Sequence, residues 1–305
     1  MLATVILCTH NRSTWLVRCL EALLPMVPQV PEFEILVVAN ACSDDTADRV
    51  RALQPAFGTA LRLITEPRPG LSLARNVGAT AARGEFLIYL DDDAIPAPGW
   101  MAAYRDYFRA HPTTEAGGGP ILPDWAGLQR PSYWRPEFEV NRARLELAPG
   151  TKEFPADVLP FGANMFLHAE AFRRLGGFDP SLGMTGKAVG LGEEVEWFLR
   201  FRASGHPLGY VEMAPVSHWV NPRDTTRWGL IRRAYSAGVV GVRVFGVPRP
   251  PQGWSGWFKH SVSALIKCRM NMGEAVYLTM ELGRLREWEQ RRRSGQGAIK
   301  RDPFL

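Results

Sequence analysis

The first third of the chain alternates short apolar runs with segments in which apolar residues recur at helical spacing. The unbroken apolar runs predict strands buried on both faces at Ala3–Cys8, Phe33–Ala39, Leu61–Thr65 and Phe86–Leu90. The helical spacing predicts helices at Trp15–Leu24, Asp45–Leu53 and Leu71–Ala82. Strands that alternate with helices are typical of a doubly wound α/β fold, with a mostly parallel sheet flanked by helices. We expect Ser13 or Thr14 to cap the first helix.

The Phe86–Leu90 run leads directly into Asp91, Asp92 and Asp93, and the prolines that follow are expected to end the element. Ligands of open α/β sheets bind outside the carboxyl ends of the strands. Adjacent carboxylates need water, hydrogen-bond donors or a cation, and Mg²⁺ and Mn²⁺ prefer such oxygen ligands. The triplet therefore indicates a metal site, and a solvated acidic turn or helix cap is the alternative.

Composition is that of a soluble globular protein, with 305 residues, 46% apolar and 22% charged. No apolar run approaches the roughly 18 residues that cross a bilayer, and the start lacks the basic region of a signal peptide. Four cysteines without metal-type spacing indicate free thiols in a reducing compartment. We expect a cytoplasmic protein, and peripheral attachment to the inner face of the cell membrane stays open.

Positive charge is concentrated in the last part of the chain. Residues 1–222 carry 20 Lys and Arg against 25 Asp and Glu, whereas residues 223–305 carry 16 against 6. This balance suggests contact with something anionic. Trp254, Trp257, Phe258, Val262, Leu265 and Ile266 share a helical face, with Lys259, Lys267 and Arg269 nearby. Such a helix fits anionic lipid, and packing on the core or on a second copy, as in a homodimer, is equally compatible.

No dinucleotide-type glycine fingerprint and no P-loop follows the first strand, which argues against nicotinamide dehydrogenases and phosphate-loop NTPases. Several motifs instead occur in order. They are Thr9-His10-Asn11-Arg12, Arg75-Asn76-Val77-Gly78, Ala82-Arg83-Gly84-Glu85 before the Asp triplet, Gly162-Ala163-Asn164-Met165, Gly176-Gly177-Phe178-Asp179 and Gly192-Glu193-Glu194. Over about residues 3–222 the chain resembles family-2 glycosyltransferases of the GT-A fold.

This resemblance implies a GT-A catalytic domain at 1–222, with a donor half at about 1–115 and an acceptor half at about 116–222. Residues 223–305 would form a helical, basic C-terminal extension. The implied activity is inverting transfer of a sugar from a UDP-, dTDP- or GDP-linked donor to a hydroxyl acceptor. The acceptor would be lipid-linked or an oligosaccharide, as in polysaccharide or glycolipid assembly, with Mn²⁺ or Mg²⁺ as cofactor and no nucleic-acid partner.

The resemblance also implies roles for single residues. Donor-binding residues would be Thr9, Asn11, Arg12, Asn40, Asp44, Arg75, Asp91 and Asp92. The metal would be held by Asp93 and His218, and Glu194 would act as general base, with Glu193, Asn164 and Trp197 on the acceptor side. The family often has an acidic residue after the second strand that reads the nucleobase, and here Asn40 follows Ala39.

Two other functions fit part of the pattern. A sugar-1-phosphate nucleotidyltransferase also uses an α/β sheet and an acidic metal site, but it usually has a glycine-rich, basic loop that Thr9–Ser13 lacks. A non-catalytic scaffold that binds sugar nucleotides at the membrane is the other. Residues 117–160 show little periodicity and predict a long loop or flap. Glu193–Arg202 and Leu278–Arg293 are predicted helices.

Overall fold

The computed structural model describes residues 1–135, 137–140, 144–184, 192–245, 253, 257 and 272–294. These residues belong to two compact units. The first contains 1–124, 144–184 and 193–219, and the second contains the other described residues.

The first unit is built on a seven-stranded sheet with strand order β3-β2-β1-β4-β8-β6-β9. Its strands are β1 (Ala3–Thr9), β2 (Phe33–Asn40), β3 (Leu61–Glu66), β4 (Phe86–Leu90), β6 (Ala116–Gly118), β8 (Asn164–His168) and β9 (Gly209–Tyr210). Every neighbouring pair is parallel except those made by β8, which runs antiparallel to β4 and β6. The predicted α/β fold with a mostly parallel sheet is confirmed, and the first four strands match their predicted positions closely.

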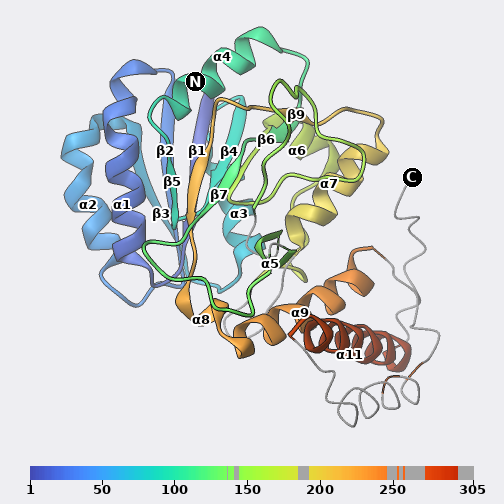
Figure 1. Cartoon of the computed structure of the whole chain (residues 1–305). Coiled ribbons are helices and arrows are strands. Elements are labelled where there is room, and N and C mark those ends of the chain that lie inside the picture. The colour runs from blue at the N-terminus through green and yellow to red at the C-terminus, as the bar shows by residue number, and fades with distance from the viewer. Residues whose placement is uncertain are drawn as a thin grey trace. The chain divides into compact units, whose positions relative to one another are not determined.

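Helices flank this sheet, and α1 and α2 lie side by side next to it (Figure 1). The helices of the unit are α1 (Ser13–Leu23), α2 (Thr46–Phe57), α3 (Leu71–Ala81), α4 (Trp100–Ala110), α6 (Ala169–Leu175) and α7 (Glu193–Ala203), with 3₁₀ turns η1 (Leu24–Gln29) and η2 (Gly58–Ala60). Helix α3 lies close against β1, because a Cβ on Gly78 would stand 2.6 Å from Ile6. The prediction that Ser13 or Thr14 caps α1 is wrong. The N-cap residue is Arg12, and its side chain makes no capping hydrogen bond.

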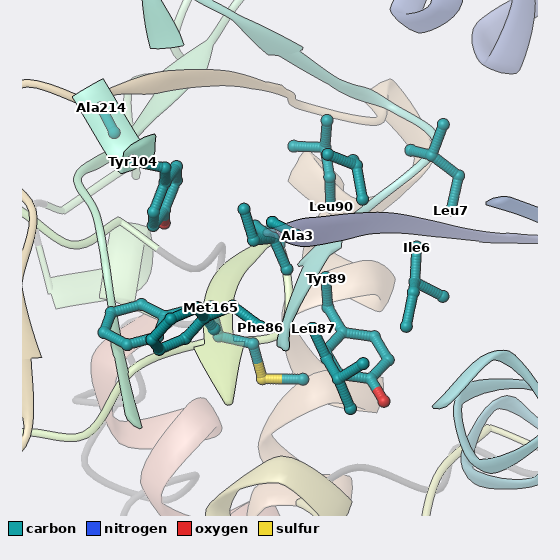
Figure 2. Packing of buried hydrophobic residues seen from close by; sticks show 14 of the residues in the cluster. Ala3, Ile6, Leu7, Phe86, Leu87, Tyr89, Leu90, Tyr104, Met165 and Ala214 are labelled. Atoms are coloured by element: carbon teal, nitrogen blue, oxygen red, sulfur yellow. The ribbon is translucent and has the colours of Figure 1, made fainter. Parts of the chain in front are cut away.

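Strand β4 is the middle of the core. All five of its residues are buried, as their unbroken apolar run predicts. Figure 2 shows Phe86, Leu87, Tyr89 and Leu90 among side chains from β1 and β8, including Met165. Phe86 stacks on Phe108 of α4 with ring centroids 3.8 Å apart. This packing fixes the end of β4, and so the start of the acidic triplet, on a rigid support.

A second, three-stranded sheet forms beside the triplet, in the order β5-β10-β7. Its strands are β5 (Ala94–Pro96), β10 (Val216–Trp219) and β7 (Ile121–Asp124). Strand β4 ends before the triplet, and the chain after the triplet forms β5, which ends at Pro96, the first of the prolines expected to end the element. Because β10 pairs with β5 in the register His218↔Ala94, it brings a histidine next to Asp93 across 125 residues of sequence.

Residues 117–160 contain regular elements, so the expectation of one long loop is wrong. Strands β6 and β7 belong to the first unit, and α5 (Glu137–Val140) belongs to the second. The glycines of β6 are required because neighbouring backbone leaves no room for a Cβ. A Cβ on Gly117 would lie 1.9 Å from the carbonyl oxygen of Gly209, and a Cβ on Gly118 would lie 2.6 Å from the carbonyl oxygen of Asn164. Glycine carries no apolar periodicity, which hides such a strand in the sequence.

Besides α5, the second unit contains the helices α8 (Pro222–Thr225), α9 (Arg227–Arg243) and α11 (Met272–Arg293). Helices α9 and α11 lie side by side (Figure 1), and their backbones meet where a Cβ on Gly238 would stand 2.0 Å from the carbonyl oxygen of Met280. The predicted Leu278–Arg293 helix falls within α11. The predicted amphipathic helix around Trp254–Arg269 lies outside the described residues except for Trp257. No helix of the described part is long and apolar enough to cross a bilayer.

Candidate active site

The candidate site lies at the edge of the sheet where the parallel strands β1, β2 and β4 end. The bend after β4 carries the acidic triplet, and Ala94 donates its backbone N–H to the Asp91 carbonyl at 3.0 Å. Asp92 and Asp93 are only 3% and 7% exposed. Carboxylates that are this buried need partners, so a solvated acidic turn does not describe these two residues.

Thr9, the last residue of β1, and Arg12, in the turn after it, supply those partners. The Thr9 hydroxyl donates to Asp92 Oδ2 at 2.6 Å, and Arg12 Nη1 lies 3.0 Å from Asp92 Oδ1. The same guanidinium is ion-paired with Asp93 through Nη2. Burial raises the pKa of Asp92 to about 7, against the effect of Arg12. Burial also opposes the ionisation of Asp93, but His218 and Arg12 hold its pKa below the usual range. Arg12 therefore forms ion pairs with two residues of the triplet.

Asp91, Asp93 and His218 form a group that could hold a metal ion. One ligand atom from each lies within 4.8 Å of the others. His218 Nε2 is 3.2 Å from Asp93 Oδ1 and 3.8 Å from Asp91 Oδ2. Two carboxylates and one imidazole suit Mn²⁺. The sequence pointed to Asp93 and His218 for the metal and to Asp91 for the donor, and the structure brings all three together.

Arg75 of α3 lies behind this group, in a buried network of acids. Its Nη1 is 2.5 Å from Glu193 Oε1 and 3.9 Å from Glu194 Oε2, and its Nη2 is 3.4 Å from Asp91 Oδ1. A Cβ on Gly162 would stand 2.1 Å from the guanidinium, so any larger residue there would have to displace the Arg75 side chain. Among the described residues, the site thus brings together the carboxyl groups of Asp91–Asp93, Glu193 and Glu194 and the guanidinium groups of Arg12 and Arg75. Burial raises the pKa of Asp92 and of Glu193, and the acidic groups still outnumber the two guanidinium groups. This excess of negative charge favours binding of a cation.

Glu193 and Glu194 begin α7 and differ in exposure. The Glu193 side chain is 2% exposed and that of Glu194 is 15% exposed. Burial, with the charge of Glu194 adding to it, raises the pKa of Glu193 to about 8. Its Oε2 accepts no hydrogen bond from any residue in the described part of the chain. Of the pair, Glu194 is the carboxylate that a ligand can reach.

Asn11, Asn40 and Asp44 connect the turns of this edge to one another. Asn11 Oδ1 accepts from the backbone N–H groups of Ser43 and Asp44, and Asp44 Oδ2 accepts from Ser13 N at 3.3 Å. Asn40 Nδ2 donates to the carbonyls of Glu66 and Arg68, and its Oδ1 accepts from Gly70 N. Both amide hydrogens of Asn40 are used in this way. A contact of the donor with the Asn40 amide hydrogens would require these bonds to rearrange.

Asn164 and Trp197, expected on the acceptor side, are completely buried. The Asn164 amide accepts from Trp100 Nε1 and the Tyr104 hydroxyl and donates to the carbonyls of Pro120 and Ala214. Trp197 donates to the Gly176 carbonyl at 2.9 Å from within an aromatic cluster. Neither side chain offers surface to an acceptor in this structure, and both support the site from behind.

A stacked pair, Trp15 of α1 and Trp219 of β10, lies next to the metal-binding group and is absent from the sequence prediction. The ring centroids are 4.1 Å apart, and the Arg18 guanidinium lies 4.7 Å from the Trp15 ring on α1. The backbone N–H of Trp219 donates to the Asp93 carbonyl at 3.0 Å. The stack therefore joins the helix that begins after Arg12 to the strand that carries His218. Only the position of Trp219 directly after His218 could have pointed to it.

Comparisons with known proteins agree with this geometry. The chain is 26% identical over 245 residues to a glucosyl-dolichyl phosphate glucuronosyltransferase of Haloferax volcanii, covering 78% of this chain and 75% of that protein. It is 24% identical over 239 residues to the succinoglycan biosynthesis protein ExoM of Rhizobium meliloti, covering 76% and 71%. Its fold is similar to that of a Pyrobaculum calidifontis mannosyltransferase in complex with GDP-Man and Mn²⁺, with a TM-score of 0.56, 19% identity, and 97% and 76% of the chains covered. The model of the family described as "Glycosyl transferase family 2" matches residues 4–176, more than half of the sequence, and the chain belongs to this family.

Proposed function

We propose that this family-2 glycosyltransferase moves a sugar, with inversion, from a nucleotide-diphosphate donor to a hydroxyl group, using Mn²⁺ or Mg²⁺. One observation carries the proposal: Asp91, Asp93 and His218 converge at an edge where, among the described residues, acidic side chains outnumber the two guanidinium groups. The mannosyltransferase of similar fold has GDP-Man and Mn²⁺ bound. A divalent ion held here would neutralise the charge that develops on the departing diphosphate.

The chain's own residues have distinct tasks in this proposal. Arg12 pairs with Asp92, and Arg75 lies 3.4 Å from Asp91, so both guanidinium groups add positive charge close to where the diphosphate would bind. Glu194 is proposed as general base, taking the proton of the acceptor hydroxyl while its oxygen attacks the anomeric carbon and the diphosphate leaves. The neighbouring Glu193 supports this task, because its raised pKa concentrates the negative charge of the pair on Glu194.

The acceptor is proposed to be a lipid-linked sugar or an oligosaccharide. The Haloferax relative is a glucosyl-dolichyl phosphate glucuronosyltransferase, and the Rhizobium relative takes part in succinoglycan biosynthesis. UDP-, dTDP- and GDP-sugars are the donors to compare. We also propose that residues 1–222 form the catalytic domain and residues 223–305 an extension. The protein is further proposed to be a homodimer.

The test is a transfer assay with a panel of nucleotide sugars and hydroxyl acceptors, with and without Mn²⁺. Wild-type protein should release nucleoside diphosphate and form a product of inverted anomeric configuration. Glu194→Gln should lower turnover by about 100- to 10,000-fold while donor binding is kept. Loss of donor binding with unchanged turnover would refute the base assignment. Release of pyrophosphate from a nucleoside triphosphate would favour the nucleotidyltransferase instead, and donor binding without turnover on any acceptor would favour the scaffold.

A further inference from the structure

The second unit exposes a tryptophan to solvent. Trp228, in the first turn of α9, is 79% exposed, although an indole ring usually buries a large apolar area. Helix α9 packs on α11 through another face, where Leu230, Ala234 and Val242 are buried. The α9–α11 contact therefore does not account for Trp228.

Three exposed arginines lie near this tryptophan in the sequence. Arg223 of α8 and Arg227 and Arg232 of α9 are all exposed, and Arg227 lies 5.2 Å from the Tyr133 ring. Arg232 lies four residues after Trp228 and so on the same side of the helix. Residues 222–233 contain four arginines and one acid, Asp224, a local balance of +3.

Asp224 is mostly buried, so it does little to reduce the positive charge at the surface. The Asp224 side chain is 12% exposed, and it pairs with Arg232 at 3.2 Å and with Arg233 at 2.8 Å. No ion pair is found for Arg223 or Arg227 with a carboxylate of the described residues. The surface thus combines one protruding aromatic ring with a basic rim.

We propose that Trp228, Arg223, Arg227 and Arg232 form a docking surface for an anionic lipid bilayer. Tryptophan has an apolar ring and a polar N–H group, which suits the boundary between headgroups and acyl chains. Basic residues beside it are attracted by the negative potential of anionic lipid. A single exposed ring with a charged rim is too small an apolar area for a stable protein–protein interface. This inference goes beyond the proposed function and does not depend on the chemistry of the acidic edge.

The test is sedimentation of the full-length chain with phosphatidylcholine vesicles that contain or lack phosphatidylglycerol. Wild-type protein should bind only the anionic vesicles, and added salt should release it. Trp228→Ala should weaken binding on the order of tenfold, and Arg223→Ala/Arg227→Ala should weaken it by about fivefold per charge. The charge-matched control Arg51→Ala/Arg173→Ala, at two exposed positions of the first unit, should bind like wild type.

Three results would overturn the proposal. They are no binding of wild-type protein to anionic vesicles, binding that neither variant weakens, and equal weakening by the control. Self-association that Trp228→Ala abolishes, without vesicle binding, would instead identify a second copy of the chain as the partner. Because Trp228 is so exposed, the variants should keep the melting temperature of the wild type, and donor hydrolysis should be unchanged.

Discussion

Replacing Glu193 by glutamine tests how the buried acids of the site share their charge. Glutamine keeps the size of the side chain and can still accept a hydrogen bond from Arg75, but it cannot ionise. The folded-state pKa of Glu193 is about 8, above the ordinary value of 4.5. A raised folded pKa means that the stabilising form is the protonated one. Its contribution is complete below pH 4.5 and is lost as the pH rises through about 8.

The size of this effect follows from the pKa difference. Each unit corresponds to about 1.4 kcal/mol, so the wild type should lose up to about 5 kcal/mol relative to Glu193→Gln between pH 4.5 and pH 8. Domains of this kind are stable by about 5–15 kcal/mol, so a loss of this size is measurable. At pH 5 the two proteins should have similar stability, and at pH 8 the variant should be the more stable one.

Urea unfolding of both proteins at several pH values measures this difference. Glu115→Gln is the matched control, because the hydrogen bond from Arg174 lowers the pKa of Glu115. Glu115 is thus ionised across the whole window, and its variant should differ from wild type by a constant amount. If Glu193→Gln also differed by a constant amount, or became less stable than wild type as the pH rose, Glu193 would be ionised throughout. The inference that the negative charge of the pair lies mainly on Glu194 would then be wrong.

Two further substitutions test the support of the site. Gly117→Ala should destabilise the protein by roughly 3 kcal/mol or prevent folding, because its Cβ would meet the Gly209 carbonyl oxygen at 1.9 Å; Gly127→Ala, at φ 78° in open space, should cost only about 1 kcal/mol in urea unfolding. Equal costs would refute the close approach. Trp219→Ala should weaken Mn²⁺ binding about tenfold by releasing the strand that carries His218, and Trp219→Phe should restore most of it. A lower melting temperature with unchanged Mn²⁺ affinity would show that the Trp15–Trp219 stack stabilises the fold but does not position His218.

Sequence patterns predicted those elements whose structure follows from the residues of the segment itself. The run Phe86–Leu90 is apolar at every position and is buried at every position. Strand β6 escaped prediction because Gly117 and Gly118 are required by neighbours distant in sequence, such as Gly209 and Asn164. No local pattern records such a contact.

In the site, too, residues with a local sequence signal were predicted, and residues whose role depends on contacts distant in sequence were not. The acidic triplet stood out because a buried strand leads into it, and the family resemblance added His218. Asn40 and Asp44 are polar residues at strand ends like Thr9, yet their side chains bind neighbouring turns. A polar residue at such an edge can hold either a ligand or another loop, and the sequence looks alike in both cases. Trp15 lay on an apolar helix face, where an aromatic ring is ordinarily core.

The central claim is that Asp91, Asp93 and His218 hold a divalent ion together with a nucleoside diphosphate. Electron paramagnetic resonance of free Mn²⁺ can measure this binding directly, with GDP, UDP and dTDP added in turn. Wild-type protein should bind Mn²⁺ more tightly with one of these nucleotides. Asp93→Ala should lose at least about 100-fold in affinity, and Asp48→Ala, at a side chain that is 82% exposed, should change nothing. If Asp93→Ala bound Mn²⁺ and nucleotide as wild type does, the acidic edge would not be the metal site.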